Sequence, residues 1–189
     1  MAINRGRASR IGFILNQVEL SNVLRRYWTD AVHWIRALFL SVMFDLDNKG
    51  AVENRLIKNA KEFAEIYRVM YGDDVAQQLE SHITNFYQNL SDMSELLFRG
   101  DMDAANRLNP DLYADLDEIV RLLGSVNSNI DQTELQVSLY ELLSLVLEEA
   151  FMIYSRDYDK GVEQYDRIVD QALRIADDLA YAITQQIHI

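Results

Sequence analysis

Apolar residues recur every three or four positions along almost the whole chain, and few residues interrupt this spacing. The 189 residues include one proline and seven glycines, fewer than an all-β or loop-rich chain of this length carries. The chain is 49% hydrophobic, so amphipathic helices can bury a sizeable core. We therefore expect an all-α fold, an antiparallel bundle of about six helices with a four-helix-bundle core.

The apolar spacing also places the helices and the breaks between them. We expect helices over residues 19–44, 51–70, 75–98, 111–123, 133–154 and 159–186, and a short helix over 102–108. Gly72 and Gly100 are expected to end helices, and Pro110 to begin one, because proline has no N–H to donate. A long helix, a turn and a second helix recur along the chain, so it can also consist of two similar halves.

Charge separates the N-terminal residues from the rest. Residues 1–26 carry five arginines and one glutamate, a net charge of +4, which leaves −16 on residues 27–189 of a chain whose total is −12. We expect a basic N-terminal arm over 1–18 and a single helical-bundle domain over 19–189. The arm can bind an anionic membrane surface or an acidic partner, or only keep the chain in solution. The acidic body disfavours nucleic acid as a partner.

Two stretches resemble membrane segments but do not meet their requirements. The apolar run at residues 11–15 is too short for the centre of a signal peptide. Residues 27–46 contain Asp30, His33 and Arg36, whereas a span needs about 20 mainly apolar residues. We expect no transmembrane segment. The chain has no cysteine, which fits the reducing cytoplasm where we expect the protein to act.

The helix expected over 19–44 is apolar on every side in its second half. Such a helix is enclosed by protein, so this half lies in the centre of the bundle or in a subunit interface. Motifs of the best-marked enzyme classes are absent from the sequence, among them the glycine-rich phosphate-binding loops and the G-x-S-x-G nucleophile pattern. Together these features favour a homodimer and a non-enzymatic role, and an enzyme of an unusual class stays open as an alternative.

Metal binding needs ligands that the sequence supplies incompletely. A ferritin-like di-metal centre takes Glu-x-x-His from two helices, and the nearest match, Asp30-x-x-His33, occurs once. We expect no catalytic residue, metal or cofactor, and favour a protein that binds a partner or a small ligand. The alternatives are a ferritin-like bundle that binds metal through interhelical His, Asp and Glu, and a protein associated with the membrane surface.

Polar residues that interrupt the apolar stripes are the candidates for a ligand site. They are Asp30, His33, Arg36, Arg55, Asn59, His82, Tyr165 and Asp177. Asp30, His33 and Arg36 follow one another at helical spacing and form a polar file opposite Trp34. This file can bind an anion or close the bundle through ion pairs. Asp177, beside the apolar stripe of the last helix, is expected to pair with Arg36 or Arg55.

Several short motifs follow one another in a fixed order along residues 20–187. The string from Leu24 to Arg36, LRRYWTDAVHWIR, is similar to a W-x-D-H-x-x-W-x-R pattern. Later landmarks are Arg55–Asn59, Tyr71-Gly72, His82-Ile83, Asp157-Tyr158, Tyr165-Asp166, Ala176–Leu179 and Ile183. This order resembles a family of small bacterial all-helical proteins whose function is not established. The resemblance implies a cytoplasmic helical bundle and no particular substrate.

Two departures distinguish the chain from that family. The family's histidine in the first helix would fall at Ala31, and here His33 stands two residues later on another face. The helix expected over 133–154 lacks a histidine that the family often carries. If the two histidines act together in the family, this chain lacks that chemistry.

Overall fold

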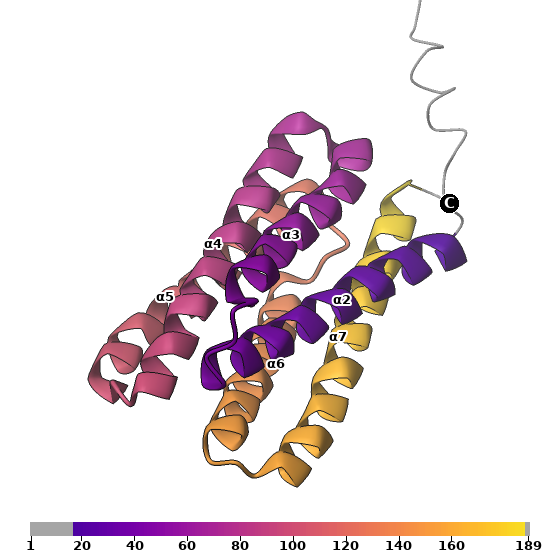
Figure 1. Ribbon diagram of the computed structural model, residues 1–189. Coiled ribbons are helices and arrows are strands. Elements are labelled where there is room, and N and C mark those ends of the chain that lie inside the picture. The colour runs from indigo at the N-terminus through magenta and orange to yellow at the C-terminus, as the bar shows by residue number, and fades with distance from the viewer. Residues whose placement is uncertain (1–16, 188–189) are drawn as a thin grey trace, which may run out of the picture.

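The computed structural model describes residues 17–187, which form six helices and no strand. The helices are α2 (Gln17–Met43), α3 (Lys49–Tyr71), α4 (Asp73–Arg99), α5 (Met102–Val126), α6 (Gln132–Tyr154) and α7 (Tyr158–Ile187). The predicted all-α bundle is confirmed (Figure 1). The expected basic arm lies, apart from Gln17 and Val18, outside the described residues. Within the described range, no helix is both long and apolar enough to cross a membrane.

Three helices form the centre of the bundle and three cover it. α2, α4 and α6 pack against one another, while α3, α5 and α7 each lie between two of them. Consecutive helices are antiparallel, so the inner three run in one direction and the outer three in the other (Figure 1). The bundle therefore has three inner helices in place of the four-helix core that we expected. It gives α2 the enclosed position predicted for it, with Leu38 and Phe39 fully buried.

The turn between α4 and α5 shows why the helices end where they do. Gly100 adopts a left-handed conformation with φ 75°, which glycine reaches without steric cost. The Asp101 side chain then accepts a hydrogen bond of 3.0 Å from the Ala104 N–H and caps α5. Gly72, with φ 94°, separates α3 from α4 in a different conformation, and no described side chain caps the start of α4. Both glycine terminators were predicted correctly.

α5 differs from the prediction at its proline. We expected a break before Pro110, but α5 is one continuous helix from Met102 to Val126. Ala105 and Leu112 are buried on the same face, seven residues apart, so continuing the helix keeps both in the core. Asn106, whose carbonyl loses its donor to the proline, is exposed like Pro110, and water can satisfy that carbonyl.

A polar network closes the end of the bundle where α2 begins and α7 ends. Asn127 is fully buried. Its Nδ2 donates to the Ala182 carbonyl (3.0 Å) and to Tyr71 Oη (3.1 Å), and its Oδ1 accepts from the Asn129 N–H (2.9 Å). Tyr71 Oη in turn donates to Gln186 Oε1 at 2.9 Å. One side chain thus joins α3, the α5–α6 loop and α7.

The opposite end, at the lower left of Figure 1, exposes several large apolar side chains among charged ones. Seven of the twelve exposed large apolar side chains in the described part of the chain lie at its three turns: Phe44, Leu46, Met102, Phe151, Tyr154, Tyr158 and Val162. The turns lie together, because Lys49 pairs with Glu95 and the rings of Phe98 and Tyr154 are 6.2 Å apart. We call these seven side chains the apolar end.

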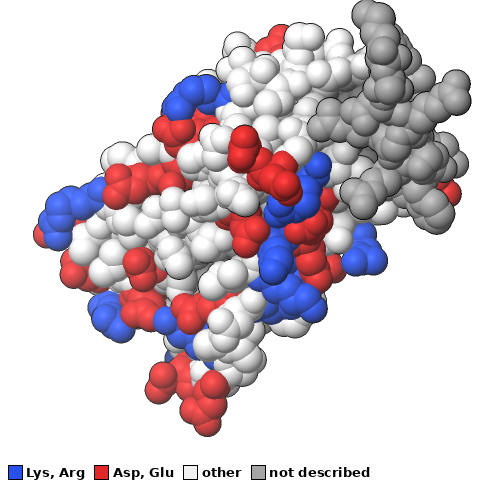
Figure 2. All heavy atoms as spheres, turned by 90° about the horizontal axis from the view of Figure 1, so that it is seen from above, with Lys and Arg blue, Asp and Glu red and all other residues white. Residues whose placement is uncertain are grey.

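Charged side chains of both signs are interleaved over the face that Figure 2 presents. Elsewhere, too, they form pairs within helices or between neighbours, such as Arg68 with Glu65 and Asp73. Exposed pairs of this kind each add about 0–1 kcal/mol to stability. Apolar packing of the inner helices, rather than surface charge, therefore holds the bundle together.

Replacing Asn127 with alanine should lower the free energy of unfolding by about 2–3 kcal/mol, because buried hydrogen-bonding groups lose their partners. Asn129→Ala is the matched control: that side chain is exposed, so the change should stay within about 0.5 kcal/mol. Urea unfolding followed by circular dichroism measures both. Equal effects of the two substitutions would contradict the role given to Asn127.

Candidate functional site: the central cavity

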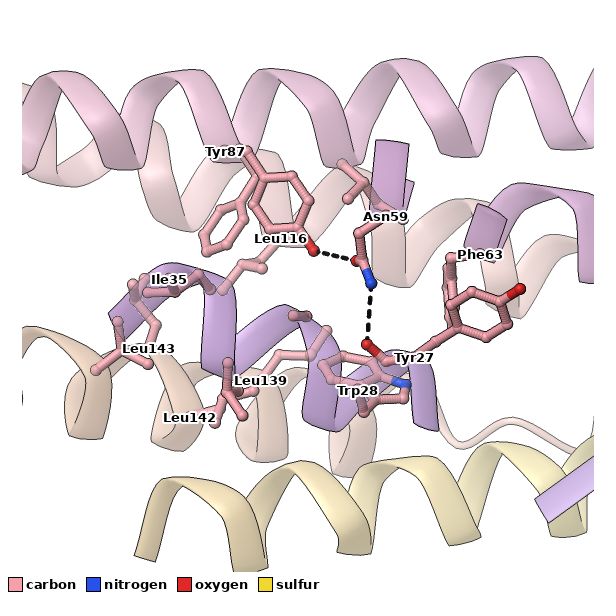
Figure 3. A pocket seen from close by; sticks show the side chains of 15 residues that line it. Tyr27, Trp28, Ile35, Asn59, Phe63, Tyr87, Leu116, Leu139, Leu142 and Leu143 are labelled. Carbon is pink, nitrogen blue, oxygen red and sulfur yellow. Dashed lines mark hydrogen bonds between the residues drawn. The ribbon is translucent and has the colours of Figure 1, made fainter. Parts of the chain in front are cut away.

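A small cavity lies where the three inner helices meet, and its volume is about 80 Å³. Its walls come from α2, α4 and α6, with contributions from α3 and α5 (Figure 3). The lining residues are Tyr27, Trp28, Ala31, Val32, Ile35, Asn59, Phe63, Ile83, Phe86, Tyr87, Leu116, Leu139, Leu142, Leu143 and Val146. None of these residues carries a charge, so the cavity favours uncharged, mainly apolar groups.

The outer side of the cavity is aromatic. Tyr27, Trp28 and Phe86 are half-buried, whereas the aliphatic lining is buried. The Trp28 ring meets Phe63 edge to face, with ring centres 6.0 Å apart. The small side chain of Ala31 leaves space beside these large rings. Rings held in this way cannot collapse freely into the space, which explains why the helices leave it unfilled.

The polar part of the lining is centred on Asn59, which is 2% exposed. Asn59 Nδ2 donates to the Tyr27 carbonyl at 3.2 Å, and Asn59 Oδ1 accepts from Tyr87 Oη at 2.8 Å. Burial raises the pKa of Tyr87 far above its usual range, against a smaller opposite effect of Arg55. The phenol therefore stays neutral, and the two bonds fix the orientation of the Asn59 amide (Figure 3).

Asp30, Arg55 and His33 gather around Trp34, away from the cavity lining. Arg55 pairs with Asp30 at 3.3 Å and with Glu62 at 3.4 Å, and its guanidinium lies 5.6 Å from the centre of the Trp34 ring. His33 is exposed, and its ring meets Trp34 edge-on at 5.3 Å. The polar file of Asp30, His33 and Arg36 was predicted opposite Trp34, and this position is wrong. His33 contacts the Trp34 ring, and Arg55, the partner of Asp30, also lies against it.

Arg36 faces α6 and α7 instead. It pairs with Glu149, which is 1% exposed, and donates to the Gly161 carbonyl at 3.2 Å. Its guanidinium lies 4.8 Å from the centre of the Tyr165 ring. Burial raises the pKa of Tyr165, and the nearby Arg36 cation opposes this effect. Arg36 and Tyr165 are thus brought together, but as part of a buried ion pair that joins three helices.

Asp177 pairs with Arg25, and not with Arg36 or Arg55 as we expected. The Arg25 guanidinium donates to both carboxylate oxygens, at 2.6 and 2.5 Å, and Ser21 Oγ donates at 2.9 Å. The bonds from Arg25 lower the pKa of Asp177. The prediction was wrong because α2 and α7 are antiparallel, so the later part of α7 faces the beginning of α2.

His82 is half-buried on α4 and faces α5. Burial raises the pKa of Asp115 on α5, and both Asn89, which donates to it at 2.7 Å, and His82 oppose that effect. His82 also helps to lower the pKa of Glu118, after the larger effect of Arg121. The predicted candidates thus lie in several separate places, and Asn59 is the one that lines the cavity.

Sequence reasoning found Asn59 but missed its partner Tyr87 and the burial of Glu149 beside Arg36. Tyr87 follows Ile83 by four residues and precedes Leu90 by three, a spacing that already places it on the buried face of α4. Glu149 follows Leu145 by four and Val146 by three, so a carboxylate stands at a core position of α6. Both residues were detectable as polar atoms on an apolar stripe.

Comparison of this chain with known proteins identifies no related protein. No protein-family model matches the chain, and searches of curated proteins and of solved structures also find no match. The family resemblance of the sequence therefore stays a prediction. Among the described side chains, no group of three or more His, Asp or Glu is placed to hold a metal ion.

Replacing Arg36 with methionine should lower the free energy of unfolding by about 3–5 kcal/mol, because it leaves the Glu149 carboxylate buried without a partner. The double variant Arg36→Met/Glu149→Met should recover most of this loss, since no buried charge is left. Arg25→Met, which breaks the exposed pair with Asp177, serves as control and should have little effect. A double variant less stable than Arg36→Met would contradict this account.

Proposed function

We propose that this protein is a non-enzymatic helical bundle that binds a small apolar ligand in its central cavity. The cavity itself is the observation that carries the proposal. Protein interiors are close-packed, and unfilled space costs about 24 cal/mol per Å³. By that measure, a cavity of this size costs about 2 kcal/mol. A bound ligand recovers such a cost, which supports a binding role.

The lining supports an apolar ligand rather than an ion. Leu139, Leu142 and Leu143 on α6 line the cavity together with Val32 and Ile35 on α2. Removing apolar surface from water contributes about 25 cal/mol per Å². A charged ligand would lose its hydration without finding an opposite charge among the lining residues.

Xenon tests the cavity directly, because apolar cavities take it up without needing polar contacts. Methyl signals of Ile35, Leu142 and Val146 should shift under xenon pressure in NMR spectra. Val32→Ile adds one methylene group to the lining, so it should weaken xenon binding and raise the free energy of unfolding by about 0.5–1 kcal/mol.

Val52→Ile is the matched control, because Val52 is equally buried in a helix but does not line the cavity. There the extra methylene should overpack the core and leave xenon binding unchanged. Wild-type methyl signals that do not respond to xenon would overturn the proposed function.

We also propose that the protein forms a homodimer through the apolar end. Seven of the exposed large apolar side chains lie at this one end, and exposed apolar side chains that gather on a surface are typical of interaction sites. Phe151 and Tyr154 on α6 and Tyr158 on α7 lie around a single turn. A symmetric dimer would place these aromatic side chains against their copies.

Phe151→Glu should convert the dimer to a monomer, because it places a charge in the proposed interface. Tyr181→Glu is the control: its exposure of 60% matches the 63% of Phe151, but it lies towards the other end of the bundle. Analytical ultracentrifugation over a range of concentrations measures both. A monomeric wild type, or equal effects of the two substitutions, would contradict the proposed dimer.

A further inference from the structure

Asn59 and Tyr87 keep unused hydrogen-bonding capacity at the edge of the cavity. An amide nitrogen carries two hydrogens and a phenol oxygen can accept as well as donate. One hydrogen of Asn59 Nδ2 binds the Tyr27 carbonyl, and the Tyr87 hydroxyl binds Asn59 Oδ1. Within residues 17–187, the second amide hydrogen has no acceptor and the Tyr87 oxygen has no donor.

Both side chains line the cavity, and Figure 3 shows them meeting at its edge, across from the leucines of α6. A ligand oxygen placed beside them can accept from Asn59 Nδ2. If that oxygen is a hydroxyl, it can also donate to Tyr87 Oη. The remaining walls offer a ligand mainly apolar surface, so the site provides one polar position and an apolar volume next to it.

We propose that the cavity takes uncharged molecules in which one hydroxyl or carbonyl oxygen is attached to a compact apolar body, and that Asn59 and Tyr87 bind this oxygen. The inference rests on the proposed function and names its ligand class. Small alcohols and ketones, or the end of a longer molecule with this chemistry, belong to the class. Carboxylates and phosphates do not, because no cation lines the cavity.

The volume limits the apolar body. A cavity of about 150 Å³ accommodates benzene, so one of about 80 Å³ takes a smaller group. A five-membered carbon ring is about as large as benzene, so it enters only when the half-buried rings of Tyr27, Trp28 and Phe86 shift outward. A longer ligand would extend between these rings towards solvent. Trp28 would therefore report binding through its fluorescence.

Four probes built on the same five-membered carbon ring separate the contributions of the apolar body, the oxygen and the charge. Cyclopentane has no polar atom, cyclopentanone only accepts, cyclopentanol accepts and donates, and cyclopentanecarboxylate is charged. Titrations use a Trp34→Phe background, in which Trp28 is the one tryptophan left in the chain. We expect the three neutral probes to bind and the carboxylate not to bind.

Tyr87→Phe then tests the oxygen contact. It should weaken cyclopentanol binding about five- to tenfold, the effect of one hydrogen bond, and change cyclopentane binding less than about twofold. Tyr140→Phe is the matched control, because Tyr140 also donates a hydrogen bond, to Asp117, but lies outside the cavity. It should leave all four titrations unchanged.

A measurement on the unaltered side chains guards against loss of folding in the variant. In the wild type, cyclopentanol should shift the NMR signals of the Asn59 side-chain amide, and cyclopentane should shift them much less. Binding of cyclopentane and cyclopentanol with equal effects of Tyr87→Phe would overturn the oxygen contact and leave the proposed function standing. Failure of all neutral probes and of xenon would overturn both. Binding of the carboxylate as tight as that of the alcohol would overturn the neutral ligand class.

Discussion

Mutual packing of α2, α4 and α6 is the constraint on which the rest of the bundle depends. Each inner helix packs against several others, and most of its residues are buried or half-buried. A polar residue on such a helix must therefore find a partner on a neighbour. Arg36 does so in Glu149, and Asp30 in Arg55. These ion pairs connect α2 to the inner helix α6 through Glu149 and to the outer helix α3 through Arg55.

The sequence predicts the helices well because their formation is local, and it predicts polar pairing poorly because pairing depends on register. Apolar spacing places most helix ends within two residues of those in the structure. Whether Asp177 meets Arg25 or Arg36 depends instead on how far α7 slides along α2. A shift of a few turns would exchange these partners without changing any amphipathic pattern. Pro110 shows the same limit, because burial of Leu112 outweighs a local preference.

The cavity was beyond sequence prediction for a related reason. Asn59 can be recognised as a polar residue on an apolar stripe, and Tyr87 has the spacing of a buried residue. That the two meet, and that Ala31 leaves space beside them, follows from the distance between helices and the rotamers of several rings. These details depend on how five helices pack together, so the sequence of a single helix does not predict them.

The Asn127 side chain has all of its hydrogen-bond partners, whereas one buried polar atom at the cavity has none among the described residues. At the end closed by Asn127, each polar atom of that side chain has a partner. Near the cavity, the buried Trp28 Nε1 and Tyr67 Oη have no hydrogen-bond partner within the described chain. Their rings form a continuous series through Phe63, at 6.0 and 5.1 Å.

Each buried polar atom without a partner costs about 1–3 kcal/mol, in addition to the cost of the cavity, whereas a whole domain is stable by about 5–15 kcal/mol. Trp28 lines the cavity, so the uncompensated cost of its Nε1 falls where the inner helices meet. A purely structural bundle gains nothing from this cost. A bundle that admits a ligand between Asn59 and Trp28 recovers part of the cost on binding, and this is the physical argument for placing function in the centre of the molecule.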